Sequence, residues 1–177
     1  MDQLQQNVRF LDTLVSGSKP STAYCYDLLA NARRRADLEQ KFDDAAARLY
    51  RAVELLAQVE LKEIYGIETS DVKDEVIPET LKREYLLKYK DNRDGRIRMP
   101  LFASYQLLKE LGNRRGERFF EVYESEIRPV LSLRNSSILA HGLNSIDEKT
   151  FRSLWGTLVR FSEIREEEIP VFPELKP

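Results

Sequence analysis

The residues best suited to chemistry lie in one short segment that carries an arginine and the sole histidine of the chain, Arg134 and His141. On a helix, residues seven positions apart differ by only about 20° around the axis, so both side chains would lie on one face. The apolar residues on that face are Ile127, Val130, Leu131 and Ile138. An unpaired guanidinium is costly to bury, so the pattern predicts a partner such as a carboxylate, a symmetry mate or a phosphate ligand.

An arginine and a histidine together suit phosphodiester chemistry. The Arg134 guanidinium can bind phosphate oxygens bidentately and neutralise them. An imidazole, with an unperturbed pKa of about 6.5, can transfer protons near neutral pH. Asn135 and Ser137 flank the pair and can hydrogen-bond the scissile region or orient the imidazole. The candidate catalytic residues are Arg134, Asn135 and His141, and the candidate substrate-binding residues are Arg128 and Ser137.

A purely structural interpretation of the same pair stays open. In it, His141 hydrogen-bonds the last carbonyls of its helix, and Arg134 pairs with a core glutamate. The spacing alone does not decide between this interpretation and the functional one.

Helices are the elements that must position this segment. Apolar residues at helical spacing predict helices over 3–15, 21–38, 42–65, 78–90, 100–111 and 117–128. The helix over 42–65 keeps its apolar period for five turns and is the expected core helix. We expect Gly66 to end this helix, the stretch Gly112–Gly116 to break the chain between two helices, and Gly142 to end the helix of the candidate site.

The end of the chain predicts one more long helix and an extended tail. Ser145-Ile146-Asp147-Glu148 has the pattern of a capping box before a buried stripe that includes Phe151 and Trp155. The tail over 169–173 contains two prolines and is not expected to be helical.

The predicted fold class is all-α, a helical bundle of about six or seven helices. At 177 residues and 42% hydrophobic content, the chain can bury a continuous core without disulfides or metal. The turn sequence over 91–95 allows one short β-hairpin around residues 88–99. We expect residues 1–20 to form an N-terminal helix and hinge, and residues 21–177 to form the main helical domain.

The composition limits the cellular locations and the binding partners that we expect for this chain. A net charge of −2 argues against a protein that coats nucleic acid over its whole surface, so any such contact must be local. Cys25 is the single cysteine, which excludes an intrachain disulfide, and no His/Cys spacing suggests a zinc site. No secretory leader and no apolar run of about 20 residues is present, so we expect a cytoplasmic protein with no membrane partner.

The segment from Arg134 to Gly142 resembles the R-x(4–6)-H signature of HEPN ribonucleases, including the asparagine that often follows the arginine. The runs over 26–32 and 42–54, and the Ser-Ile-Leu-Ala-His-Gly ending, resemble the HEPN half of CRISPR-associated CARF–HEPN proteins. The resemblance covers about Thr22 to Phe172.

This resemblance implies a metal-independent endoribonuclease of type III CRISPR antiviral defence, needing no cofactor. Such an enzyme would cut single-stranded RNA through attack of the ribose 2′-hydroxyl, leaving a 2′,3′-cyclic phosphate and a 5′-hydroxyl. Because the chain has one histidine, we expect a homodimer with a composite active site. Family members also carry a CARF sensor domain, for which this chain has no room, so the sequence is either an effector half or a standalone relative. It gives no basis for cyclic oligoadenylate binding.

Two other function classes remain open from the sequence. A non-catalytic HEPN-like module could hold a nucleotide or a partner protein, such as a toxin, through the same polar face. A structural dimerisation domain could use Arg134 and His141 for interchain salt links, although Asn135 and two serines supply more polar groups than a dry interface requires.

Overall fold

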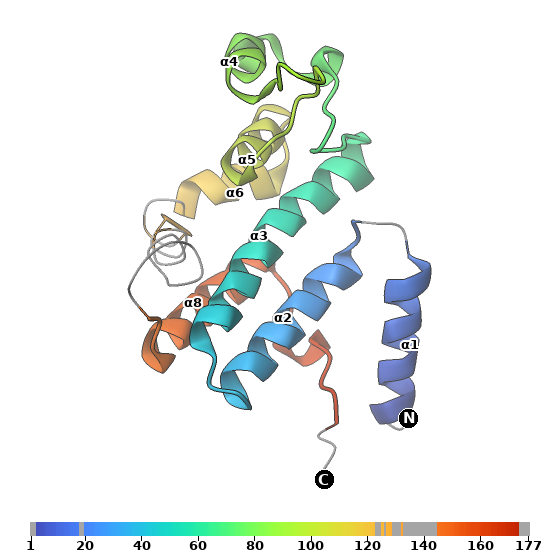
Figure 1. Ribbon diagram of the computed structural model, residues 1–177, viewed down its shortest axis with the longest axis vertical. Coiled ribbons are helices and arrows are strands. Elements are labelled where there is room, and N and C mark those ends of the chain that lie inside the picture. The colour runs from blue at the N-terminus through green and yellow to red at the C-terminus, as the bar shows by residue number, and fades with distance from the viewer. Residues whose placement is uncertain are drawn as a thin grey trace. The chain divides into compact units, whose positions relative to one another are not determined.

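The structure, a computed structural model, describes residues 3–17, 20–122, 125, 127–128, 132 and 145–173. The described α-helices are α1 (Gln3–Ser16), α2 (Thr22–Asp37), α3 (Phe42–Tyr65), α4 (Glu79–Tyr89), α5 (Leu101–Glu110), α6 (Arg114–Val122) and α8 (Glu148–Ser162) (Figure 1). Two short 3₁₀ turns are η1 (Asp74–Val76) and η4 (Glu166–Glu168). These ranges contain no β-strand, which confirms the all-α class.

Most helix ends lie within a residue or two of their predicted positions. Gly66 ends α3 as expected, with a φ of 67° that disfavours any residue with a Cβ atom. The hairpin expected around 88–99 is reduced to isolated antiparallel bridges of Ile97 with Val72 and with Lys90. The tail over 169–173 is non-helical, as its prolines predicted.

Two predicted helix starts are wrong. The predicted break between two helices is confirmed, since residues 111–113 separate α5 from α6, but α6 begins at Arg114 and not at the predicted Glu117. The side chain of Asn113 accepts hydrogen bonds from the amides of Arg115 (2.9 Å) and Gly116 (3.3 Å), and so caps the helix before the glycine. Similarly, Asp147 rather than Ser145 is the N-cap of α8, since its carboxylate accepts from the Thr150 amide at 2.8 Å.

The chain divides into two compact units, one made of residues 1–53 and 128–177 and the other of residues 54–127. Helix α3 begins in the first unit and ends in the second. The predicted division at residue 20 stays a prediction.

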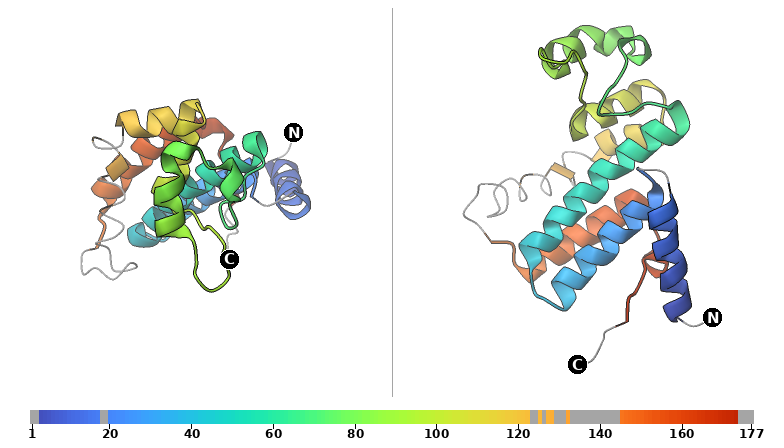
Figure 2. Two further views of the ribbon diagram at one scale, coloured as in Figure 1. Left: turned by 90° about the horizontal axis from the view of Figure 1, so that it is seen from above. Right: turned by 45° about the vertical axis from the view of Figure 1, so that its right-hand side comes forward.

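The first unit is built from α1, α2, the beginning of α3, and α8. Small side chains on α2 and α3, including Ala32 and Ala45, are fully buried and allow close helix packing. The Phe151 ring of α8 is also fully buried and lies 6.1 Å from the ring of Phe42 on α3. Helix α1 lies beside α2 (Figures 1 and 2).

The second unit is built from the end of α3 with α4, α5 and α6. Its buried centre is the stacked ring pair of Tyr105 and Phe119, with centroids 4.0 Å apart. The buried Tyr85 hydroxyl of α4 donates to the Ala103 carbonyl of α5 at 2.8 Å, and burial raises the pKa of Tyr85. These contacts join α4, α5 and α6 within this unit.

Candidate functional site

The residues predicted to do the chemistry, Arg134, Asn135, Ser137 and His141, lie outside the described residues, and so does the predicted helix end at Gly142. Of the candidate site residues, the structure describes Arg128. What it does describe in detail is the framework on either side of this segment, in α6 before it and in α8 after it.

The framework before the segment is fixed by a cluster of polar side chains around Glu60 of α3. One Glu60 carboxylate oxygen accepts from the Asn113 side-chain amide at 2.9 Å, and the other accepts from Nε of Arg115 at 2.7 Å. The side chains of Glu60 and Arg115 are only 20% and 19% exposed, so this ion pair is shielded from solvent. The cluster therefore ties the start of α6 to α3.

Sequence analysis missed this polar cluster. The available signal was Asn113 after Gly112, because an asparagine just after a left-handed glycine is a common start for a second helix. The pairing of Arg115 with Glu60, which lies 55 positions away, has no comparable signal in the sequence.

Arg128 begins the stretch that carries the predicted site. The preceding residue, Ile127, is fully buried, whereas Arg128 is exposed. The assignment of Arg128 to substrate binding stays a prediction.

The framework after the segment is anchored at Ile146. This residue is 6% exposed, and its amide donates to the Asp43 carboxylate in the first turn of α3 at 3.2 Å. Asp147 then caps α8, and the hydrogen bonds from Thr150 hold the pKa of the Asp147 carboxyl below its ordinary value. The chain is thus held within the first unit before α8 starts.

The arginine run 33–35 has a structural role in the first unit. Arg33 donates to the carbonyls of Ile169 (3.2 Å) and Pro170 (3.4 Å), and Arg35 pairs with Glu39 at 2.5 Å and Asp44 at 3.2 Å. The Arg34 guanidinium lies 4.6 Å from the centroid of the Phe172 ring, and burial lowers the pKa of Arg34. This run holds the tail and α3 in place.

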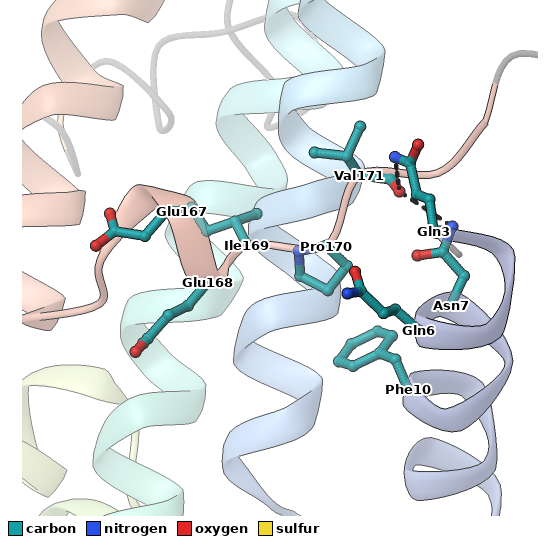
Figure 3. Close-up of a pocket in the computed structure, with 9 residues that line it drawn as sticks. All are labelled: Gln3, Gln6, Asn7, Phe10, Glu167, Glu168, Ile169, Pro170 and Val171. Atoms are coloured by element: carbon teal, nitrogen blue, oxygen red, sulfur yellow. Dashed lines mark hydrogen bonds between the residues drawn. The ribbon is translucent and has the colours of Figure 1, made fainter. Parts of the chain in front are cut away.

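A pocket of about 420 Å³ lies in the first unit between α1 and the tail. Its lining residues are Gln3, Gln6, Asn7, Phe10, Glu167, Glu168, Ile169, Pro170 and Val171. Figure 3 shows the amides of Gln3 and Asn7 directed at the Val171 carbonyl, to which they donate at 2.9 and 3.0 Å. These two polar groups hold the tail beside α1.

Neither a cluster of metal-ligating side chains nor a membrane-spanning helix is present among the described residues. They contain no group of three His, Cys, Asp or Glu side chains arranged to hold a metal ion. None of the described helices has both the length and the apolar character to cross a membrane.

The chain matches the protein family described as the Csm6 HEPN domain over residues 14–165. The matched range includes Arg134 and His141. Comparisons with curated proteins and with solved structures gave no match. The family match covers well over half of the chain and agrees with the all-α architecture, so this protein belongs to the Csm6 HEPN domain family.

Proposed function

We propose that this protein is a metal-independent endoribonuclease that cleaves single-stranded RNA in CRISPR-linked antiviral defence. The observation that carries the proposal is the family match over 14–165, since it spans the whole Arg134–His141 motif. HEPN domains of the CRISPR-associated kind are ribonucleases, and the motif supplies the two groups that this chemistry needs.

In the proposed reaction, the 2′-hydroxyl of the RNA attacks the adjacent phosphorus atom. Arg134 binds the nonbridging phosphate oxygens and offsets the negative charge that develops on them. His141 transfers a proton, either from the attacking hydroxyl or to the departing 5′-oxygen. Asn135 orients the imidazole. The products carry a 2′,3′-cyclic phosphate and a 5′-hydroxyl.

Each cleavage needs a proton acceptor and a proton donor, and one chain has one histidine. We therefore place the active site at a twofold axis, where two copies of His141 and Arg134 meet. The two arginines would repel each other without an anion between them, so this interface holds a groove for the phosphate rather than dry packing.

The direct test measures cleavage of a fluorescent single-stranded RNA with excess chelator and identifies the product ends. We expect His141→Ala and Arg134→Ala each to lower the rate by about 100-fold or more. Arg93→Ala is the matched control, because Arg93 is an exposed turn residue and its loss removes the same charge. An all-deoxy substrate should resist cleavage, since it lacks the nucleophile.

Three outcomes would reject parts of the proposal. Full activity in a folded His141→Ala variant rejects the catalytic assignment. RNA binding without turnover by the unmodified chain favours the non-catalytic module. For the composite site, wild-type chains are mixed with excess His141→Ala chains; activity that stays proportional to wild-type chains after complete exchange assigns the site to one protomer.

A further inference from the structure

One face of α1 carries a row of large aliphatic side chains exposed to solvent. The exposed fractions are 57% for Leu4, 50% for Val8, 46% for Leu11 and 86% for Val15. At about 100° per residue, these four residues, here called the α1 stripe, fall within about 60° around the helix axis. The exposed aliphatic residues therefore form one continuous line along the helix rather than scattered positions.

A different face of α1 attaches the helix to the rest of the first unit. Asn7 is only 6% exposed and donates to the Val171 carbonyl, and the Phe10 ring lies 6.3 Å from the ring of Phe172. The Tyr24 hydroxyl of α2 donates to the Leu14 carbonyl at 2.7 Å. Because α1 is already held by these contacts, the stripe could pair without the cost of forming a new helix.

The spacing and residue types of the stripe match a two-stranded coiled coil. The intervals along the stripe are four, three and four residues, which is the alternation of heptad a and d positions. Valine then occupies both a positions, Val8 and Val15, and leucine occupies both d positions, Leu4 and Leu11. β-branched residues at a with leucine at d favour parallel pairs of helices.

The charges of α1 favour a protein helix as the occupant. Its sequence contains one basic and one acidic residue, Arg9 and Asp12, so the helix has no net charge. A helix that binds an anionic membrane or RNA needs an excess of basic residues. In a parallel pair, the two copies of Asp12 occupy e positions on opposite sides of the pair, so no like charges face each other.

We propose that the α1 stripe is a pairing surface for a second copy of this chain, with the two α1 helices parallel. The attachment face, marked by Asn7 and Phe10, lies about 100° from the stripe. A twofold axis along the helices puts the two attached bodies on opposite sides of the pair. An antiparallel pair would put both bodies on the same side, where they would collide. This inference does not depend on the nuclease proposal.

Disulfide trapping in the full chain tests the arrangement. In a parallel pair, Val8 faces Val8 of the second copy, so Val8→Cys should form an intermolecular disulfide under mild oxidation. Thr13→Cys is the matched control, because Thr13 is exposed but lies on the far side of α1. The native Cys25 is fully buried and should stay unreacted. We expect cross-linking of Val8→Cys to exceed the control by at least about tenfold.

Leu11→Asp tests the stripe by placing a charge between the two α1 helices. When it is introduced beside Val8→Cys, we expect it to lower the intermolecular cross-linking at least about tenfold, whereas Thr13→Asp should leave the cross-linking unchanged. Circular dichroism checks that both variants fold. A wild-type chain that stays monomeric at high micromolar concentration overturns the inference. Cross-linking of Val8→Cys that is unchanged by Leu11→Asp also overturns it, whether or not a dimer forms at the proposed active site. Cross-linking only between Val8→Cys and Leu11→Cys chains rejects the parallel arrangement.

Discussion

Helices α6 and α8, one in each unit, both contain an internal glycine, and the two glycines have opposite surroundings. A Cβ atom built on Gly116 of α6 would lie 2.3 Å from the Lys109 amide nitrogen and 2.6 Å from the Leu108 carbonyl carbon. A Cβ atom on Gly156 of α8 would meet only the end of the Arg160 side chain, at 3.5 Å. Gly116 is therefore required for close packing of α6 on α5, whereas Gly156 leaves space unused.

This difference shows how each unit fixes the helix that precedes or follows the candidate segment in the sequence. In the second unit, the backbones of α5 and α6 touch, and the Glu60 cluster ties the start of α6 to α3. In the first unit, α8 begins at the Asp147 cap, and buried rings such as Phe151 hold it. Close backbone contact tolerates almost no added volume, while packing of large side chains can adjust by small rotations.

The largest effect that follows from this comparison is expected for Gly116→Ala. The added methyl group would overlap backbone atoms of Leu108 and Lys109, which cannot move aside like the tip of a flexible side chain. We expect the free energy of unfolding to fall by about 3 kcal/mol, the upper end for overpacked cores. Urea unfolding measures the change, and amide exchange should place the loss of protection in α5 and α6. A variant as stable as the wild type would show that α6 can move away from α5 without cost.

The second effect is expected for Glu60→Ala, which removes the acceptor of both Asn113 and Arg115. Hydrogen bonds to a shielded charged group contribute about 1.5–3 kcal/mol, so we expect a loss of about 2 kcal/mol in the free energy of unfolding. Glu63→Ala is the matched control, because Glu63 lies on the same helix and is exposed. Its change should stay within about 0.5 kcal/mol. Equal losses for the two variants would assign the effect to α3 itself rather than to the cluster.

The sequence predicted the helices well because their signals are local. The apolar period of α3, the stop at Gly66 and the prolines of the tail each act within a few residues, and each prediction is confirmed. Gly116 was predicted to break the chain between two helices. What requires a glycine there is the close approach of the α5 backbone, and packing between helices leaves no local signal in the sequence. The predicted capping box is wrong for a related reason. Asp147 competes with Ser145 as the N-cap of α8, and which of the two caps the helix depends on where Ile146 is anchored.

The candidate site was predicted from a different kind of signal. Arg134 and His141 stand out because they interrupt an apolar face, and such conflicts between local pattern and burial often mark functional residues. The family match shows the HEPN family, and the roles of Arg134 and His141 stay predictions. The Glu60–Arg115 pair could not be predicted, since charged residues are common along the chain and only the fold brings these two together.

The smallest effect, and the one opposite in sign, is expected for Gly156→Ala. Alanine favours a helix interior over glycine by up to about 1 kcal/mol, because glycine loses more backbone entropy on folding. At Gly156 the new methyl group meets only the Arg160 guanidinium at 3.5 Å, an ordinary van der Waals contact. We expect the free energy of unfolding to rise by about 0.5–1 kcal/mol, measured under the same urea conditions as Gly116→Ala. If Gly156→Ala destabilises the protein instead, α8 also needs a close approach at this position, and the contrast between the two helices is wrong.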